Sequence, residues 1–421
     1  MSVLFYNIFL LLFRAATHIA SLFNPKAKKW VRGRKDIFAR LQAAISPGEK
    51  IIWMHCASLG EFEQGRPVIE KLKYQIPNSK ILLTFFSPSG YEVRKDYKGA
   101  DWVFYLPPDG SRNARRFLEI VQPALVIFVK YEFWYYYLKK IKYRNIPLLL
   151  ISALFRKDMS FFKWYGGLQR KILSRFDHLF VQNEASKKLL DEIGLGNITS
   201  VSGDTRFDRV IEMAERFESI QLIEQFIGSS KTLVAGSTWP EDEEMLQKAF
   251  RQLDDASIKL IIAPHEIEEK RLTYLKKLFP SAILFSELNA TVPQAIESNC
   301  LIIDNVGMLS RLYRYGYITY VGGGLKKMGV HNVLESAVHS RPVLMGPYYH
   351  KYIEAVGLVN SAGGTVVQNE NDLAIKIKRM LKDNDGSYAN ASAAAGSFIK
   401  SNAGATQKIL NYIQEKRLLT N

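Results

Sequence analysis

Short apolar runs separated by amphipathic segments recur along most of this chain. Runs such as 50–55, 80–85 and 125–129 consist largely of Ile, Leu, Val and Phe, and they are too short to be helices. Segments with helical periodicity, such as 61–72, lie between them. Apolar strands that alternate with helices predict a mostly parallel sheet with both faces covered. The first series of predicted strands is 50–55, 80–85, 102–106, 125–129, 148–152, 178–181 and 198–202.

A second series follows a largely polar segment that predicts a helical linker over 209–230. Its predicted strands are 232–235, 259–263, 301–304, 317–321 and 341–345. The fold class is therefore α/β, with two Rossmann-like domains at 25–208 and 231–400. A helix over 401–421 is expected to pack back on the first domain. Because ligands of such sheets bind beyond the carboxyl ends of the strands, a cleft between the domains is the expected site.

The N-terminal segment is apolar and is followed by a cluster of basic residues. Residues 1–13 are broken only by Ser2 and Asn7, and residues 25–40 hold seven Lys or Arg and one Asp. This pattern predicts a membrane anchor over residues 1–24, with the following domain on the cytoplasmic side. Arg14 interrupts the apolar run, so the segment either spans the membrane or lies in its interface. The alternative is a buried N-terminal helix.

Composition and charge narrow the choice of partner. The chain has 421 residues, with 57 Lys and Arg against 41 Asp and Glu, a net charge of +16. This balance suits anionic lipid or a phosphorylated substrate. Zinc-finger spacing and RNA-binding aromatic signatures are absent from the sequence, which disfavours nucleic acid. Two cysteines far apart in the sequence favour a reducing compartment.

The stretch 317–335 combines a strand, three glycines and a helix start. Gly322–Gly324 follow the apolar run directly, and Asn332 is suited to cap the next helix. A Gly-rich turn before a helix N-terminus can hold a phosphate with free N–H groups. Glu335, in the first turn, is placed to accept hydrogen bonds from a ribose diol. The alternative is an ordinary strand-to-helix connection.

Glu61 follows a Ser–Leu–Gly turn at the start of a predicted helix. A carboxylate held on such a turn can act as a general base toward a hydroxyl. The alternative is an ordinary acidic residue at a helix start. The histidines lack metal-ligand spacing, and the sequence contains neither a GxSxG nor a Walker phosphate motif.

Several motifs, taken in order, resemble those of the transferases of 3-deoxy-D-manno-octulosonic acid (Kdo). Residues 53–61, Trp-Met-His-Cys-Ala-Ser-Leu-Gly-Glu, resemble the family's Trp-x-His-x-x-Ser-x-Gly-Glu, whose Glu is the proposed base. Residues 329–335, Gly-Val-His-Asn-Val-Leu-Glu, resemble its Gly-Gly-His-Asn-x-x-Glu, a cytidine nucleotide site. Four further stretches also resemble family motifs: Tyr105–Asp109, Glu132–Trp134, Gly203–Asp208 and Ser237–Thr238.

The resemblance implies a GT-B glycosyltransferase that moves Kdo from CMP-Kdo to the lipid A precursor with inversion, without a metal or cofactor. The catalytic residues it implies are Glu61, Arg206 and Lys130. The nucleotide-binding residues are Ser237, Thr238, Pro264, His265, Gly307, Met308, Leu309, Gly323, Gly324, His331, Asn332, Val333, Leu334 and Glu335. The basic cluster 26–40 is expected to hold the phosphorylated acceptor at the membrane. Arg32, Arg34, Lys35, Ser58 and Gly60 are the acceptor-binding residues.

This chain departs from the family pattern at several of these positions. His265 stands where the family has Arg, and Met308 where it has Glu. Lys130 replaces a Glu, and Arg206 replaces a Lys. These changes keep two alternatives open: another GT-B enzyme that transfers or epimerises a different nucleotide sugar, or a membrane-bound anionic-lipid binding protein without catalysis. Residues 155–175, rich in aromatic and basic side chains, predict either an interfacial surface or a solvated amphipathic helix.

Overall fold

The computed structural model describes residues 3–253, 255, 257–288 and 298–419. Parts of the predicted anchor (1–2), of the second predicted domain (254, 256 and 289–297) and of the predicted C-terminal helix (420–421) lie outside the described residues. The chain forms two compact units. Unit 1 comprises Met1–Arg209 and Ala403–Asn421, and unit 2 comprises Val210–Asn402.

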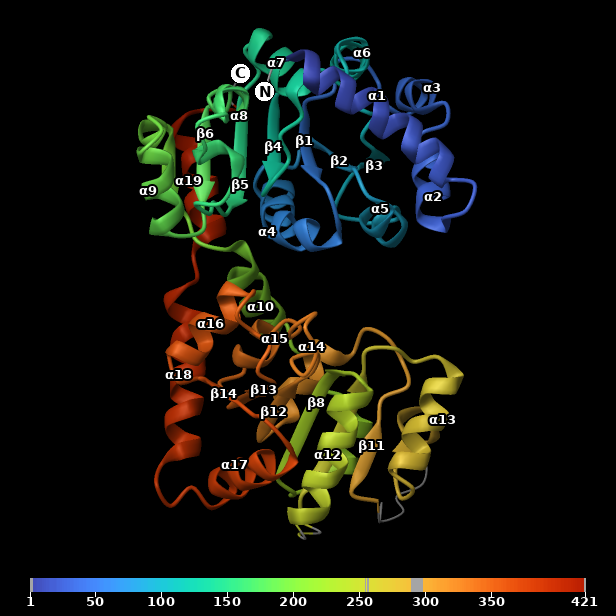
Figure 1. The fold of residues 1–421 in the computed structure, drawn as a ribbon, viewed down its shortest axis with the longest axis vertical. Helices are drawn as coiled ribbons and strands as arrows, with labels where there is room; N and C mark the ends of the chain where they lie inside the picture. The colour runs from blue at the N-terminus through green and yellow to red at the C-terminus, as the bar shows by residue number, and fades with distance from the viewer. Residues whose placement is uncertain (1–2, 254, 256, 289–297, 420–421) are drawn as a thin grey trace. The chain divides into compact units, whose positions relative to one another are not determined.

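Unit 1 is built on a parallel sheet of seven strands in the order β3-β2-β1-β4-β5-β6-β7 (Figure 1). All seven coincide with predicted strands to within two residues at either end, which confirms the α/β fold class for this half. Their bounds are β1 Ile51–Cys56, β2 Lys80–Phe85, β3 Trp102–Tyr105, β4 Leu125–Val129, β5 Leu148–Ala153, β6 His178–Val181 and β7 Thr199–Val201.

Both faces of this sheet are buried, as its apolar strands require. Along β1, Ile51 and Trp53 join the core on one face, while Ile52 and Met54 join the core on the other. This alternation follows from the two-residue period of a strand. The helices that cover the sheet are α1 Val3–Ala20, α2 Pro25–Gly33, α3 Ile37–Ala44, α4 Leu59–Gln75, α5 Pro88–Arg94, α6 Ser111–Val121, α7 Tyr135–Tyr143, α8 Gly167–Leu173 and α9 Glu184–Asp191.

The C-terminal helix α19 (Ala405–Glu415) also belongs to unit 1. Its residues Ile409 and Ile413 are buried in the core beside α4. The carboxylate of Asp208 accepts hydrogen bonds from the backbone N–H groups of Gly404 (2.5 Å) and Thr406 (2.6 Å) at the start of this helix. Asp208 therefore fixes the tail of the chain at the end of unit 1.

Unit 2 contains a second parallel sheet of seven strands, ordered β10-β11-β9-β8-β12-β13-β14. The strands are β8 Thr232–Thr238, β9 Lys259–Pro264, β10 Ile283–Leu284, β11 Cys300–Ile302, β12 Ile318–Val321, β13 Val343–Met345 and β14 Gly364–Val366. The sequence did not predict β10 and β14. Both are edge strands, and two or three residues are too few to show a hydrophobic period.

The helices of unit 2 include the segment predicted as a linker. Helix α10 (Thr205–Glu215) begins in unit 1, and α11 (Gln221–Ile227) buries Ile223 and Phe226 within unit 2. The other helices are α12 Pro240–Leu253, α13 Glu269–Leu278, α14 Leu309–Leu312, α15 Leu334–Ala337, α16 Ile353–Asn360, α17 Glu370–Lys382 and α18 Ser387–Ser401.

Helix α1 lies beside α2 on the surface of unit 1 (Figure 1). The hydroxyl of Tyr6 donates a hydrogen bond to Asp109 (2.7 Å) and accepts one from the backbone N–H of Tyr135 (3.2 Å). About two turns further on, Phe13 packs against Trp30 and Phe86. Both halves of the helix are thus attached to unit 1.

The opposite face of α1 is apolar and exposed, with Leu4, Phe5, Ile8, Leu11 and Leu12 between 43% and 70% accessible. Among the described residues, α1 is the one helix long and apolar enough to cross a membrane, judged by length and composition alone.

Residues 155–175 do not form the amphipathic helix that was one of the two alternatives for this segment. Phe155 and Phe161 are buried and pack edge-on against each other and beside Phe133. The segment contains only the short helix α8 and a 3₁₀ turn at Ser160–Phe162. Trp164, by contrast, is 92% exposed. Core packing uses most of the aromatic side chains that suggested a surface role.

We expect Tyr6→Phe to loosen α1 from unit 1, because it removes the buried hydrogen bond to Asp109. The loss should be about 1–2 kcal/mol, which should raise the rate of tryptic cleavage at Arg14 by about 5- to 30-fold if cleavage requires local opening. Tyr136→Phe is the matched control, since its hydroxyl bonds only the exposed Asn7. Equal cleavage of both variants would contradict a role for Tyr6 in docking the helix.

Candidate active site

The strand order of unit 1 reverses between β1 and β4, which are neighbours in the sheet. Loops that leave a parallel sheet at such a point diverge to opposite faces and open a crevice, where ligands of doubly wound sheets bind. The β1 loop leads to Glu61, and the β4 loop carries Lys130 and Glu132. The fold thus brings together two segments about 70 residues apart in the sequence.

Glu61 lies in the first turn of α4, behind the N-cap residue Ser58. Its carboxylate turns back and accepts a hydrogen bond from the backbone N–H of Ala57. The residue is 9% exposed. The side chain is therefore held at the helix start, and a small part of the residue is accessible to solvent.

Glu132 is the centre of a buried network beside Glu61. Its Oε2 atom lies 2.8 Å from Nε2 of His55 and accepts a hydrogen bond from the indole N–H of Trp134 (2.5 Å). The other ring nitrogen of His55 lies 2.8 Å from the hydroxyl of Thr84. These contacts fix the position of the Glu132 carboxylate.

The pKa of Glu61 is raised from 4.5 to about 7. Burial is the largest cause, and the charge of Glu132 adds to it. The hydrogen bonds from the backbone and the charge of Lys130 act in the opposite direction. A carboxylate with a pKa near the working pH is suited to accept a proton from a hydroxyl and release it again.

Lys130 has a left-handed backbone conformation, with φ of 65°. Such a conformation is unusual for a residue other than glycine and is concentrated at functional sites. Its ammonium group lies 5.5 Å from the ring centre of Tyr131. The positive charge of Lys130 acts on Glu61. The family pattern has a Glu at the position of Lys130.

Arg206, at the start of α10, is paired with Asp204. Its guanidinium donates hydrogen bonds to Oδ2 of Asp204 at 3.0 and 2.7 Å, and the side chain is 23% exposed. The carboxylate of Asp204 neutralises part of the positive charge of Arg206. The catalytic role of Arg206 stays a prediction.

The residues predicted to bind the acceptor divide into two groups. Arg32 and Lys35 are exposed and line a cavity in unit 1. Arg34 is buried: it donates hydrogen bonds to the carbonyl oxygens of Trp30, Phe86 and Leu106 and lies 3.8 Å from the centre of the Trp30 ring.

Burial lowers the pKa of Arg34 to about 9. These contacts favour a structural role for its guanidinium. Ser58 and Gly60 lie in the turn before Glu61, and their acceptor contacts stay predictions.

In unit 2 the strand order reverses between β8 and β12. The loop after β8 carries Trp239, the loop after β9 carries His265, and the loop after β12 carries His331. Their rings form a stack, with centres 4.8 Å apart for Trp239 and His265 and 4.5 Å apart for His265 and His331. Three separate loops thus contribute one aromatic surface.

The indole N–H of Trp239 donates to Nε2 of His331 (2.9 Å). A ring nitrogen that accepts this bond must carry no proton, so His331 is neutral. Burial, with a smaller contribution from the charge of His265, lowers the pKa of His331 to about 4. Trp239 and His331 therefore present uncharged rings at physiological pH.

Asp242 fixes the glycine loop to the start of α12. Its carboxylate accepts hydrogen bonds from the backbone N–H groups of Trp239 and Gly323 (both 2.9 Å) and from the hydroxyl of Tyr320 (2.7 Å). Gly323 has φ of 86°, and a Cβ at Gly324 would lie 2.7 Å from the backbone nitrogen of Gly346.

The glycines thus serve close packing of loops. The N–H group of Gly323 is already occupied by Asp242, which is a different use from the phosphate contact expected from the sequence. Nucleotide contacts by Gly323 and Gly324 stay predictions.

The helix predicted after Asn332 is present but short. Helix α15 spans only Leu334–Ala337. Oδ1 of Asn332 accepts a hydrogen bond from the backbone N–H of Leu334 (3.2 Å), and its amide donates to Glu335 (2.9 Å). Four residues align too few peptide dipoles to provide a strong positive terminus.

The remaining predicted nucleotide residues lie at the carboxyl edge of the same sheet. The Thr238 hydroxyl donates to Glu243 (2.7 Å), which also pairs with Arg271. Ser237 has a left-handed backbone, with φ of 52°. Pro264 ends β9; Gly307 and Met308 precede α14, which Leu309 begins; Val333 and Leu334 are buried. Their contacts to a nucleotide stay predictions.

Comparison with known proteins identifies the family. A 3-deoxy-D-manno-octulosonic acid transferase of Aquifex aeolicus is 30% identical over 335 residues, which cover 78% of this chain and 86% of that protein.

This chain belongs to the Kdo transferase family.

The family model described as 3-Deoxy-D-manno-octulosonic-acid transferase (kdotransferase) matches residues 32–209, most of unit 1. The solved structures of a UDP-GlcNAc 2-epimerase from Neisseria meningitidis and a glycosyltransferase from Rickettsia africae are similar in fold, with TM-scores of 0.60 and 0.56. They share 16% and 15% identity and cover 87% and 89% of this chain, and the matches span 100% of each of those chains. At this identity the likeness shows the fold, which is the GT-B architecture expected of a Kdo transferase.

Three features of this Kdo transferase were not predicted from the sequence. His55 was noted only as part of a motif, but it holds Glu132. Trp239 and Asp242 belong to none of the motifs singled out in the sequence. Each acts through a partner 77 or more residues away in the sequence, and no local pattern reports such a pairing.

Metal-binding side chains do not cluster in the described part of the chain. No group of three His, Cys, Asp or Glu residues there is placed to share an ion. Cys56 is buried at the end of β1.

We expect Glu61→Gln to stabilise unit 1 at alkaline pH. Because the folded chain disfavours ionised Glu61, the wild-type free energy of unfolding should fall as the pH rises from 4.5 to about 7. The variant lacks this penalty and should be more stable by about 2–3 kcal/mol at pH 8, but by under about 1 kcal/mol at pH 5.

Thermal unfolding at the two pH values measures this difference. Glu63 lies on the same helix α4 as Glu61 and pairs with Arg94 of α5. Glu63→Gln should therefore show no such gain in stability. A Glu61→Gln gain that is the same at both pH values would contradict the raised pKa.

Proposed function

We propose that this protein is a lipid A Kdo transferase. It moves Kdo from CMP-Kdo to a hydroxyl of the lipid A precursor in lipopolysaccharide biosynthesis, with inversion at the anomeric carbon. The family membership supports the transferred sugar. The observation that carries the proposal is the raised pKa of Glu61 beside the fixed carboxylate of Glu132.

In the proposed reaction Glu61 removes the proton from the acceptor hydroxyl. The hydroxyl oxygen forms a bond to the anomeric carbon of Kdo while the bond from that carbon to the CMP phosphate oxygen breaks. The proton ends on Glu61 and the electron pair leaves with CMP. The second carboxylate supports this assignment, because its negative charge makes Glu61 a stronger base.

We assign CMP binding to unit 2. The aromatic stack of Trp239, His265 and His331 offers a flat aromatic face at the carboxyl edge of the sheet. Glu335 supplies a carboxylate that can accept hydrogen bonds from the ribose diol, and Asn332 orients it. His265, which replaces the family's Arg, uses its ring for stacking and cannot make the bidentate phosphate contact of an Arg.

The protein is proposed to act at the cytoplasmic face of the bacterial inner membrane. The exposed apolar face of α1 and the basic residues of α2 provide hydrophobic and electrostatic attraction to an anionic lipid surface. Because Tyr6 and Phe13 attach both halves of α1 to unit 1, the helix lies in the plane of the interface in this proposal.

We expect Glu61→Gln to lower the rate of Kdo transfer by at least about 10²- to 10⁴-fold, because the general base is lost. CMP binding, measured by calorimetry, should be unchanged. In the wild type, kcat/KM should fall below an apparent pKa of about 7, where Glu61 becomes protonated.

The assay uses purified protein, CMP-Kdo and the lipid A precursor, and a panel of other nucleotide sugars tests the donor. Full activity of Glu61→Gln would remove the base assignment. Transfer from another donor alone would replace the proposed substrate.

We expect Glu335→Gln to weaken CMP binding about 10-fold or more, which is the contribution of one charge-assisted hydrogen-bonded group. Glu370→Gln, at the start of α17 in the same unit, is the control and should bind CMP as the wild type does. Calorimetric titration measures both. Equal affinities of the two variants would remove Glu335 from the nucleotide site.

A further inference from the structure

The loop after β4 carries a tyrosine that the reaction described above does not use. Tyr131 is half-buried, and its hydroxyl oxygen is buried without a hydrogen-bond partner among the described residues. Other buried tyrosine hydroxyls of unit 1 are paired, that of Tyr6 with Asp109 (2.7 Å) and that of Tyr137 with the carbonyl oxygen of Pro107 (3.1 Å). An unpaired buried hydroxyl is unfavourable, so the position of Tyr131 calls for a functional explanation.

The backbone at Tyr131 is fixed on both sides. Before it, Lys130 has a left-handed conformation, and its N–H group donates a hydrogen bond to the carbonyl oxygen of Ile151 (2.9 Å) in β5. After it, the carboxylate of Glu132 is held 2.8 Å from a ring nitrogen of His55. The unpaired hydroxyl therefore belongs to a residue whose neighbours in the chain are both anchored.

Tyr131 keeps its proton at physiological pH. Burial is the largest cause that raises its pKa above the ordinary value of 10.0. The charge of Arg156 acts in the opposite direction, and the charges of Glu61 and Asp158 raise the pKa further. The phenol is therefore a hydrogen-bond donor that lies within electrostatic range of the candidate base.

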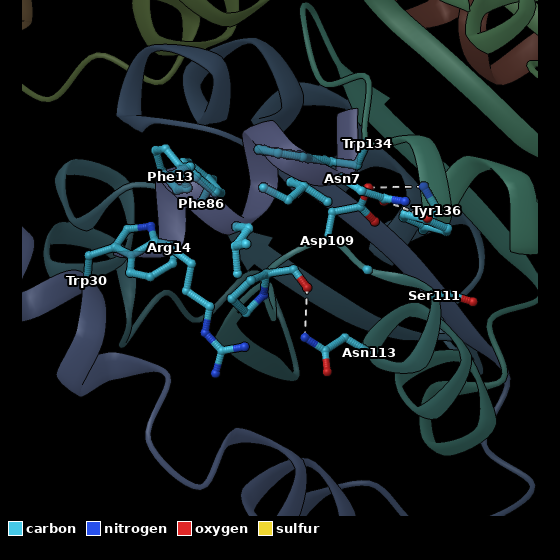
Figure 2. Close-up of a pocket in the computed structure, with 14 residues that line it drawn as sticks. Asn7, Phe13, Arg14, Trp30, Phe86, Asp109, Ser111, Asn113, Trp134 and Tyr136 are labelled. Atoms are coloured by element: carbon cyan, nitrogen blue, oxygen red, sulfur yellow. Dashed lines mark hydrogen bonds between the residues drawn. The ribbon is translucent and has the colours of Figure 1, made fainter. Parts of the chain in front are cut away.

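Glu61 and Glu132 already accept hydrogen bonds from donors other than Tyr131. The backbone N–H of Ala57 donates to Glu61, and the indole N–H of Trp134 donates to Glu132. The ring of Trp134 lines a cavity beside α1, and Tyr131 does not belong to the lining of that cavity (Figure 2). The hydroxyl of Tyr131 is thus suited to an acceptor other than these two carboxylates.

The transferred sugar of the proposed reaction supplies such an acceptor. In an ulosonic acid the anomeric carbon carries the carboxylate, so this group comes close to Glu61 when the acceptor oxygen attacks. Three negative charges then meet, those of the sugar, Glu61 and Glu132, and their repulsion has to be offset by donors or cations. Lys130 provides an ammonium group 5.5 Å from the ring centre of Tyr131. A Glu at this position, as in the family pattern, would add a fourth negative charge instead.

We propose that the hydroxyl of Tyr131 donates a hydrogen bond to the carboxylate of the transferred sugar, beside the positive charge of Lys130. A movement of the partly exposed Lys130 side chain or of the Tyr131 ring opens the hydroxyl to this ligand. The contact orients the anomeric carbon toward the attacking oxygen, and no proton is transferred. The inference rests on the proposed function in one respect, namely that the donor sugar is an ulosonic acid.

The test compares two variants of the full chain that each lose one tyrosine hydroxyl. Tyr131→Phe removes the proposed ligand contact. Tyr97→Phe is the control, because its hydroxyl donates to Glu70 (3.1 Å) within unit 1. Affinities for CMP-Kdo and for CMP are measured by calorimetry without acceptor, and kcat and KM are measured for both substrates.

We expect Tyr131→Phe to bind CMP-Kdo about 10-fold or more weakly than the wild type does, which is the contribution of one hydrogen bond to a charged group. Its affinity for CMP alone should be unchanged. In transfer, kcat/KM for CMP-Kdo should fall at least as much, while KM for the lipid acceptor stays the same. Tyr97→Phe should remain within about twofold of the wild type in all of these quantities.

Thermal unfolding separates a binding role from a structural one. Because the Tyr131 hydroxyl has no partner among the described residues, Tyr131→Phe should leave the unfolding temperature unchanged or raise it. Tyr97→Phe breaks a hydrogen bond and should lower that temperature. A loss of stability in Tyr131→Phe without a loss of CMP-Kdo affinity would show a structural role and would overturn the inference.

A donor analogue identifies the part of the sugar that Tyr131 contacts. CMP-Kdo in which the carboxyl group is converted to an amide should bind the wild type more weakly than CMP-Kdo does. Tyr131→Phe should then weaken the amide less than it weakens CMP-Kdo, because the charged partner of the hydroxyl is already gone. Equal losses for the two donors would place the hydroxyl on another part of the sugar and contradict the proposal.

The outcomes distinguish this inference from the proposed function. If the wild type transfers Kdo but Tyr131→Phe matches Tyr97→Phe in donor affinity and kcat/KM, the inference fails and the function stands. If the wild type binds CMP-Kdo more tightly than CMP, and Tyr131→Phe loses this difference, but no Kdo reaches the lipid A precursor, the function fails and the sugar contact stands. A raised KM for the lipid acceptor with unchanged donor affinity would assign Tyr131 to the acceptor and overturn the inference.

Discussion

The chemistry of this protein depends on two carboxylates held close together in a largely dehydrated place. Glu61 and Glu132 belong to loops that follow β1 and β4, and these loops meet because the strand order reverses between those strands. Burial and mutual repulsion both disfavour two negative charges there. The fold meets this cost by fixing Glu132 with His55 and Trp134. The remaining penalty falls on Glu61 and raises its pKa to about 7.

A similar principle organises the second unit, with a different result. Asp242 is buried and accepts three hydrogen bonds, so that one carboxylate fixes the loop after β8 to the loop after β12. The consequence is that the positions of these two loops are fixed relative to each other. Trp239 and His331, which belong to these two loops, are held at the spacing of a ring stack. The glycines allow the loops to approach, and the aspartate keeps them together.

The N-terminal helix is linked through buried hydrogen bonds to the part of unit 1 that carries Glu132. Tyr6 reaches Asp109, which also accepts hydrogen bonds from the first backbone N–H groups of α7, those of Tyr136 and Tyr137. The same α7 begins next to Trp134 and the carboxylate network. A single buried acid therefore links the position of the apolar helix to the loop that carries Glu132.

The sequence by itself determined the two α/β series, the position of nearly every long strand and the assignment to the Kdo transferases. Strand periodicity and motif order are local properties, so they can be read without coordinates. It also determined that Glu61 stands at a helix start. The raised pKa of Glu61, however, requires Glu132, and the loss of Arg34 as a free cation requires the three carbonyl oxygens around it.

The tertiary structure alone decided which groups meet. It shortened the helix after Asn332 to four residues and gave the glycine loop a packing role. It also placed Arg14 of α1 and Arg116 of α6 around one cavity, although about 100 residues separate them in the sequence. Such encounters depend on how strands are ordered and how helices are laid over them. That order is set by burial of the whole apolar surface, which no single segment encodes.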